Sequence, residues 1–258
     1  MNDKHKSRKK IEAELEYYDK NKYKSSRGWL ERWLINLQPM LPSAIDKIIR
    51  TLGDIKDRKI CEIGCGTGSL TLAMAKKGAV ISAVDISETE IRIAEKKNSE
   101  FIPEQVTFHK MNVCELDFPD SSFDFVTGMS ILHHTDINAI GSEIYRVLKP
   151  GGRAIFTEPL AHNPISNLWR KVTPSIRTKN EKPLRYDEIR LIGEKFRKII
   201  YREFALLTLL SSLVYLFTFS RNLKLKSGNW LERKEQSFMS RLPFFKKMSG
   251  LVLIEFTK

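Results

Sequence analysis

The chain has 258 residues, of which 41% are hydrophobic and 29% are charged, and this balance excludes an intrinsically disordered chain. The length allows one large domain, or one domain with a cap, around a sizeable hydrophobic core. A formal net charge of +13 predicts an acidic partner (an anionic membrane, a nucleic acid or an acidic substrate) or else a solvated, lysine-rich surface.

The cysteines and the N-terminus bear on the compartment. Cys61, Cys65 and Cys114 are odd in number, and no second cysteine pair or histidine cluster completes a zinc set, so we expect no metal site. Reduced thiols fit an intracellular protein. The lysine-rich N-terminus is not followed by the apolar stretch of a secretory signal, and we therefore expect a cytoplasmic location.

Two helices are predicted before the first strand. Residues 11–37 have apolar side chains at helical spacing, with Gly28 as a break, and residues 43–52 predict a second helix. The aromatic side chains of the first helix, Trp29 and Trp33 among them, fit either the wall of a ligand cleft or an ordinary core.

A glycine-rich turn follows the first predicted strand, residues 59–63. Gly64, Gly66 and Gly68 occupy every second position, and residues 69–77 predict a helix. Glycines let a ligand approach the backbone and a helix start offers unpaired N–H groups, so this unit suits a nucleotide-like ligand. The G-x-G-x-G spacing differs from the dinucleotide pattern G-x-G-x-x-G, which disfavours a nicotinamide-dependent reductase. The alternative is a glycine-rich turn that holds no ligand.

This stretch, with Glu62 two residues before the first glycine, resembles motif I of the class I S-adenosylmethionine-dependent methyltransferases, E/D-x-G-x-G-x-G. The resemblance is to the methyltransferase type 11, or UbiE-like, branch of that family. It implies S-adenosylmethionine as the cofactor. The carboxylate of Glu62 stands where it can meet the cationic part of such a ligand.

The second predicted strand, residues 79–84, ends at an acidic residue, Asp85, and a helix capped by Ser87 continues to residue 98. A carboxylate at the tip of a second parallel strand can accept from both hydroxyls of a ribose, because it has two acceptor oxygens. A role as an ordinary turn residue is the alternative for Asp85.

The third predicted strand, residues 106–111, is followed by Asn112, where the family usually has an Asp that accepts from the adenine amino group. The amide of Asn112 keeps an acceptor oxygen but no charge. Residues 116–126 match the family's L-P-F-P-D-x-S-F-D-x-V stretch, with Asp117 in place of proline, and lead into the fourth strand. The resemblance thus assigns cofactor contacts to Glu62, Gly64, Cys65, Gly66, Gly68, Asp85, Ile86, Asn112, Val113 and Met129.

The remaining elements alternate between helix and strand. Helices are predicted at 137–148 and 187–196, a tight turn at 148–152, and strands at 153–158, 198–204 and 250–257.

The resemblance implies an α/β, Rossmann-like fold: a seven-stranded, mostly parallel sheet with helices on both faces and an antiparallel last strand between the fifth and the sixth. It further implies an N-terminal helical lid at residues 1–45 and a methyltransferase domain at residues 46–258. We expect insertions in that domain at about 159–186 and 206–248, the second of them helical.

Residues 204–219 contain no charged side chain, and basic residues flank them. The run is shorter than the ~20 apolar residues of a spanning helix, and a spanning segment would separate two strands that belong to one sheet. The remaining interpretations are a buried helix, a wall for a lipophilic acceptor, and a patch that rests on an anionic bilayer. The flanking residues are Arg202, Arg221, Lys224 and Lys226.

We therefore predict a methyltransferase acting on oxygen or carbon of a small, lipophilic acceptor, with peripheral contact to an anionic membrane. Side chains after the fourth and fifth strands are candidates for a general base, although each also fits a structural role. These candidates are His133, His134, Glu158 and His162. The alternatives are an RNA methyltransferase, supported by charge alone, and a catalytically silent binding protein on the same fold. Nucleic acid is the less favoured partner, since neither an Asn-Pro-Pro-Tyr stretch nor a Pro-Cys nucleophile is present.

Overall fold

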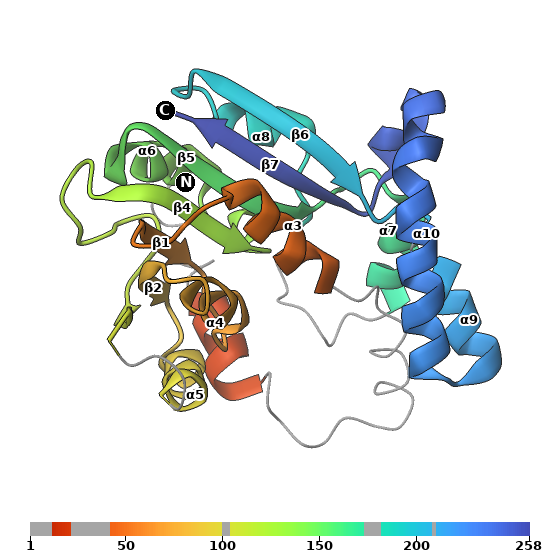
Figure 1. Cartoon of the computed structure of the whole chain (residues 1–258), viewed down its shortest axis with the longest axis horizontal. Coiled ribbons are helices and arrows are strands. Elements are labelled where there is room, and N and C mark those ends of the chain that lie inside the picture. The colour runs from red at the N-terminus through yellow and green to blue at the C-terminus, as the bar shows by residue number, and fades with distance from the viewer. Residues whose placement is uncertain (1–11, 22–41, 100–103, 173–181, 208–209) are drawn as a thin grey trace.

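The computed structural model describes residues 12–21, 42–99, 104–172, 182–207 and 210–258. One seven-stranded sheet, in the order β3-β2-β1-β4-β5-β7-β6, runs through the molecule (Figure 1). The strands are β1 Lys59–Ile63, β2 Val80–Asp85, β3 Val106–Lys110, β4 Phe123–Met129, β5 Leu148–Pro159, β6 Lys198–Phe204 and β7 Leu251–Thr257. Strands β1 to β5 pair in parallel, whereas β7 is antiparallel to both β5 and β6. The predicted Rossmann-like architecture, with its antiparallel last strand, is confirmed.

Helices cover both faces of this sheet (Figure 1). The described helices are α3 Pro42–Leu52, α4 Ser69–Ala75, α5 Glu88–Asn98, α6 Ile137–Val147, α7 Pro164–Val172, α8 Tyr186–Ile192, α9 Ser211–Thr218 and α10 Arg221–Arg241. Short helical turns lie at η1 Tyr17–Asn21, η2 Leu132–His134 and η5 Pro243–Met248. Residues 12–16 are helical and run directly into η1.

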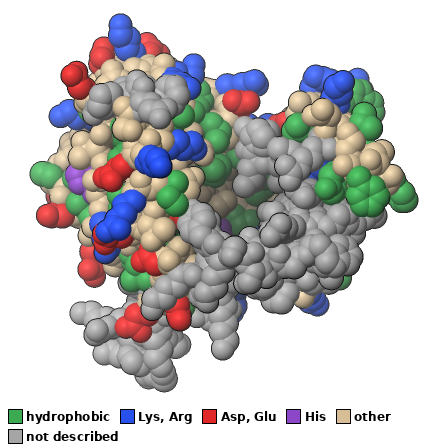
Figure 2. Space-filling model, turned by 90° about the horizontal axis from the view of Figure 1, so that it is seen from below, with side chains coloured by type: hydrophobic (Ala, Val, Ile, Leu, Met, Phe, Trp, Pro, Cys, Tyr) green, Lys and Arg blue, Asp and Glu red, His purple; other side chains and the backbone are tan. Residues whose placement is uncertain are grey.

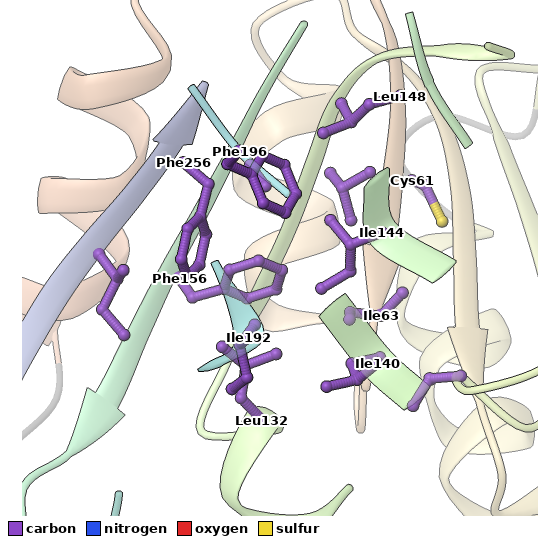
Figure 3. Packing of buried hydrophobic residues seen from close by; sticks show 14 of the residues in the cluster. Cys61, Ile63, Leu132, Ile140, Ile144, Leu148, Phe156, Ile192, Phe196 and Phe256 are labelled. Atoms are coloured by element: carbon purple, nitrogen blue, oxygen red, sulfur yellow. The ribbon is translucent and has the colours of Figure 1, made fainter. Parts of the chain in front are cut away.

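The two faces carry separate hydrophobic cores, because successive side chains of a strand point to opposite sides. In β5, Phe156 packs with Ile144 of α6 and Ile189 of α8 (Figure 3 shows this core). The preceding Ile155 belongs to the core under α3 and α4, with Ile48 and Met74. All of these side chains are buried, so the middle strands are fixed from both sides.

Two predicted boundaries differ from the structure by more than two residues. The predicted turn at residues 148–152 is part of β5, since Leu148 pairs with Phe123 before a register shift at Arg153. Helix α8 ends at Ile192, before the predicted residue 196, and a side chain at Gly193 would collide with Ile199 and Phe256. Of the first predicted helix, residue 11 and residues 22–37 lie outside the described residues.

Candidate active site

A cavity of about 300 Å³ opens at the carboxyl ends of β1, β2, β3 and β4. It lies where the strand order reverses, between β1 and β4, which is the usual ligand position of open α/β sheets. Nine of the ten predicted cofactor residues line it: Glu62, Gly64, Cys65, Gly66, Asp85, Ile86, Asn112, Val113 and Met129.

The three loop glycines are required for different reasons. A β-carbon at Gly64 would lie 2.6 Å from the side chain of Ile131, and one at Gly68 would lie 2.6 Å from Nδ2 of Asn98 on α5. Gly68, the predicted residue that does not line the cavity, thus lets α5 approach the loop. At Gly66, where φ is +49°, a β-carbon would meet Glu90 Oε2 at 3.5 Å. Gly66 is therefore the glycine whose missing side chain leaves space toward the cavity.

Glu62 enters the cavity wall from the end of β1 as a buried carboxylate. Its Oε2 accepts a hydrogen bond of 2.6 Å from the hydroxyl of Thr71, one turn into α4. Burial raises the pKa of Glu62 to about 8, and the negative charge of Asp85 acts in the same direction. A cation bound in the cavity would lower the pKa of Glu62 again.

Asp85, at the end of β2, holds the glycine loop in place. Its two carboxylate oxygens accept from the backbone N–H groups of Gly66, at 2.8 Å, and Ser87, at 2.9 Å. Burial raises the pKa of this carboxyl above its ordinary value, although both hydrogen bonds oppose the shift. The residue therefore links the loop after β1 to the N-cap of α5.

Glu90 is a third carboxylate in the cavity wall, and the sequence analysis did not single it out. The residue is buried, and its N–H donates to the Oγ of Ser87, the N-cap of α5. The signal that could have found it is this cap: a residue in the first turn of a helix that starts at a ligand loop lies beside that loop. Together with Glu62 and Asp85, Glu90 places three carboxyl groups in the cavity wall, an arrangement suited to a cation, which favours their ionised form.

Asn112 follows β3 and lines the same cavity. Its Oδ1 accepts a hydrogen bond of 3.0 Å from the N–H of Cys114, which closes the turn after the strand. Cys65 lies in the wall beside the glycines, where burial raises the pKa of its thiol.

The four predicted base candidates fall into three environments. His134 lines the cavity, and its Nδ1 lies 2.9 Å from Oε1 of Glu14 in the N-terminal helix. His133 and Glu158 are buried against one another, with Nδ1 of the histidine 2.6 Å from Oε2 of the carboxylate. His162 is exposed and stacks on Tyr186, with 5.8 Å between the ring centroids.

The carboxylate of Glu158 supports the loop after β4. Its Oε1 accepts from the backbone N–H groups of Ile131 and Leu132, at 2.9 and 2.8 Å, while Oε2 faces His133. Neither Glu158 nor His133 is among the residues that line the cavity. Among the four candidates, His134 is thus the one placed to meet an acceptor.

The N-terminal segment closes one side of the cavity. Glu14 and Tyr18 belong to its wall. Asp19 reaches the start of α5, where Oδ1 accepts from the hydroxyl of Ser87 and from the N–H of Thr89 at 3.3 Å. Tyr18 is one of the aromatic side chains of the first predicted helix, for which a place in the wall of a ligand cleft is one of two interpretations. Glu14 is a site residue that the sequence reasoning missed, since nothing local to residues 12–21 indicates which loop it contacts.

Over the described ranges, no group of three or more His, Cys, Asp or Glu side chains is arranged to hold a metal ion. No helix in the described part of the chain is long and apolar enough to cross a membrane.

Comparison with known families finds similarity over the part of the chain that includes most of the cavity wall. Residues 61–156, which include the glycine loop, Asp85 and His134, match the family model described as a methyltransferase domain. The chain is 33% identical over 135 residues to a ubiquinone biosynthesis O-methyltransferase of Alkalilimnicola ehrlichii, covering 52% of this chain and 54% of that protein. It is 40% identical over 117 residues to a demethylmenaquinone methyltransferase of Symbiobacterium thermophilum, covering 43% and 45%. The chain spans about half the length of the curated relatives it matches.

Solved structures share the whole fold. The geranyl diphosphate C-methyltransferase of Streptomyces coelicolor superposes with a TM-score of 0.65 over 96% of this chain and 97% of that one. The two sequences are 14% identical, so the likeness concerns the fold alone.

Proposed function

We propose that this chain, whose residues 61–156 match the family model described as a methyltransferase domain, transfers a methyl group from S-adenosylmethionine to oxygen or carbon of a small, lipophilic acceptor. The observation that carries the proposal is the acidic cavity wall made by Glu62, Asp85 and Glu90 around Gly66. Such a wall suits a ligand that combines positive charges with ribose hydroxyls.

Each residue of the wall would contact a different part of the cofactor. Glu62 and Glu90 would face its cationic part, because buried carboxylates favour a cation over a neutral ligand. Asp85 would accept from the ribose hydroxyls, and Asn112 with Val113 would line the adenine. When bound, S-adenosylmethionine supplies a methyl group that is already activated on a sulfonium cation.

His134 is the group that we assign to take the acceptor's proton. An imidazole whose Nδ1–H faces a carboxylate has its basic lone pair on Nε2, and the carboxylate stabilises the imidazolium that forms. Glu14 supplies that carboxylate at 2.9 Å. A phenol or an enol acceptor, which must lose a proton to react, would use this pair.

Two of the matched proteins are named for ubiquinone biosynthesis and for demethylmenaquinone, which supports a lipophilic acceptor here. A lipophilic acceptor partitions into the bilayer, and the net charge of +13 favours an anionic surface. We place the reaction in the cytoplasm, at the face of such a membrane.

The test is to incubate the protein with methyl-labelled S-adenosylmethionine and a cell extract, and to separate lipid, RNA and water-soluble fractions. We expect label in the lipid fraction with the wild type and none with Asp85→Ala. Label in RNA would favour the RNA methyltransferase, for which the basic charge is the supporting observation. Cofactor binding without label in any fraction would favour the silent binding protein.

A further inference from the structure

Helices α9 and α10 form a hairpin at one side of the molecule (Figure 1, right). Phe219 ends α9 in a left-handed conformation with φ of +52°, and Ser220 caps α10 by accepting from the N–H of Leu223. The turn between the two helices is therefore short and well defined.

The second half of α10 is fixed to the body of the protein. Glu232 pairs with Lys47 of α3 at 2.6 Å, and Glu235 Oε2 accepts from the N–H of Leu207 at 2.7 Å. The side-chain amide of Gln236 donates to the carbonyl of Glu203 in β6. These contacts set the direction of the helix.

The first half of α10 continues beyond these contacts alongside α9. The eleven residues before Glu232 rise about 16 Å along the helix axis. Within the hairpin, Gly228 lies against Ser211, and the ammonium of Lys224 lies 5.8 Å from the ring centroid of Tyr215. The turn thus lies at the end of two helices that pack on one another.

Large apolar side chains are exposed at this turn. The exposed fraction is 81% for Phe217, 67% for Phe219 and 47% for Leu223. Figure 2 shows apolar side chains and Lys or Arg side chains together on the hairpin, at the right of the view. Single exposed apolar residues are ordinary, but two aromatics and a leucine within seven positions indicate a contact surface.

The charge around the turn has one sign. Residues 204–231 contain no Asp or Glu, whereas Arg221, Lys224 and Lys226 follow the turn directly. Lys224 is buried beside Tyr215, and Lys226 is exposed. An exposed apolar end with the exposed Lys226 beside it complements an anionic bilayer, where the aromatics enter the headgroup region and the ammonium stays with the lipid charges. RNA binding would instead call for a basic groove that tracks the backbone.

We propose that the tip formed by Phe217, Phe219 and Leu223, flanked by Lys226, inserts into the headgroup region of an anionic membrane. The purpose of this docking rests on the proposed function, because docking would hold the enzyme where a lipophilic acceptor resides. The docking itself needs no methyl transfer and is measured without it.

The test is co-sedimentation of the full chain with phosphatidylcholine vesicles that contain or lack about 30% phosphatidylglycerol, at low and high salt. We expect the wild type to bind the anionic vesicles at low salt only. Phe217→Ser with Phe219→Asn should weaken binding roughly tenfold or more, and Lys226→Glu by at least about fivefold. Asn suits the left-handed position of Phe219, which protects the fold of this variant.

Phe244→Ser is the matched control, because Phe244 is 75% exposed but lies in η5, beyond the other end of α10. We expect its vesicle binding to equal that of the wild type. Equal binding by the tip variant, or an equal loss in Phe244→Ser, would overturn the proposal. So would a wild type that ignores anionic vesicles but binds an RNA homopolymer through the same tip residues.

Calorimetry with S-adenosylmethionine on the same proteins separates the two proposals. Cofactor binding with no tip-dependent vesicle binding would reject the docking alone. Vesicle binding by a wild type that does not bind the cofactor would reject the proposed function alone.

Discussion

At the scale of single residues, Gly66 allows the clearest test of the cofactor loop. Gly66→Val would place a branched side chain toward the cavity, and we expect the affinity for S-adenosylmethionine to fall roughly tenfold or more. Gly151→Val is the control: it has a similar positive φ of +74° but no atoms around its β-carbon within 4 Å. Both variants should lose about 1–2 kcal/mol of stability from backbone strain. Calorimetry should find the affinity reduced in the first variant alone, and equal affinities would remove Gly66 from the site.

Glu62 predicts a pH dependence of cofactor binding. With a pKa of about 8, the free protein holds this carboxyl protonated at neutral pH. A bound cation favours the carboxylate, so binding releases a proton and the affinity should rise with pH, by up to about tenfold per unit, until it levels off near pH 8. In the free protein the same group contributes stability below its unfolded pKa that is lost as the pH rises toward about 8.

Calorimetry in buffers of different ionisation enthalpy measures this proton release. Glu62→Gln cannot ionise, and its affinity should be independent of pH between 6 and 8 to within about twofold. A wild type that binds without proton exchange would show that Glu62 does not face the cationic part of the ligand.

From the position of His134 we expect that its substitution lowers turnover and leaves cofactor binding unchanged. His134→Ala should lower kcat by about 10²–10⁴-fold while the calorimetric affinity for S-adenosylmethionine stays unchanged, because the base meets the acceptor. Glu14→Gln should lower kcat less and shift the acidic limb of the pH–rate profile, since the imidazolium loses its carboxylate. His162→Ala, on an exposed stacked ring, should behave as the wild type. Unchanged turnover in His134→Ala would show that His134 is not the general base.

At the scale of elements, the N-terminal helix is held over the cavity by a contact at each end. Glu14 meets His134, and Asp19 meets Ser87 and Thr89 at the start of α5. These contacts join segments 68 to 120 residues apart, so the helix cannot leave without breaking charge-assisted hydrogen bonds. Of these contacts, the one between Glu14 and His134 lies in the cavity wall.

Asp19→Ala should therefore loosen the N-terminal helix without unfolding the sheet. We expect S-adenosylmethionine to dissociate about fivefold faster in stopped-flow measurements, because the hydrogen bonds to α5 are lost. Glu12→Ala, an exposed position on the same helix, is the control and should leave the dissociation rate unchanged. A rate that Asp19→Ala does not alter would mean that the segment does not retain the cofactor.

At the scale of the whole molecule, the α9–α10 hairpin interrupts a pair of neighbouring strands. Phe204 at the end of β6 pairs with Leu251 at the start of β7, and the N–H of Gly250 donates to the carbonyl of Ala205. The 44 residues between Ala205 and Gly250 are therefore dispensable for strand pairing, since a two-residue turn can join antiparallel neighbours.

Replacing residues 206–249 by Asn-Gly should give a folded protein that binds S-adenosylmethionine with near wild-type affinity and no longer binds vesicles. Removal of residues 251–258 is the contrasting change, and it should abolish cooperative thermal unfolding because β7 lies between β5 and β6. Circular dichroism and calorimetry distinguish these outcomes. A shortened protein that does not fold would show that the hairpin belongs to the core of the domain.

The sequence alone determined the strands, the glycine loop and the position of Asp85, because each depends on short-range patterns. A short apolar run such as residues 59–63 forms a buried strand in a sheet that is covered on both faces. Glycines at every second position restrict the turn that follows. Asp85 follows from the same logic, since neighbouring parallel strands end at one edge.

Only the tertiary structure decided which polar side chains meet. His133 and His134 are adjacent in the sequence, yet one is buried against Glu158 and the other faces the cavity beside Glu14. Glu90 joins the cavity wall through the cap of α5. Such contacts depend on how helices and loops 25 to 120 residues apart pack together, and local propensity carries no information about that packing.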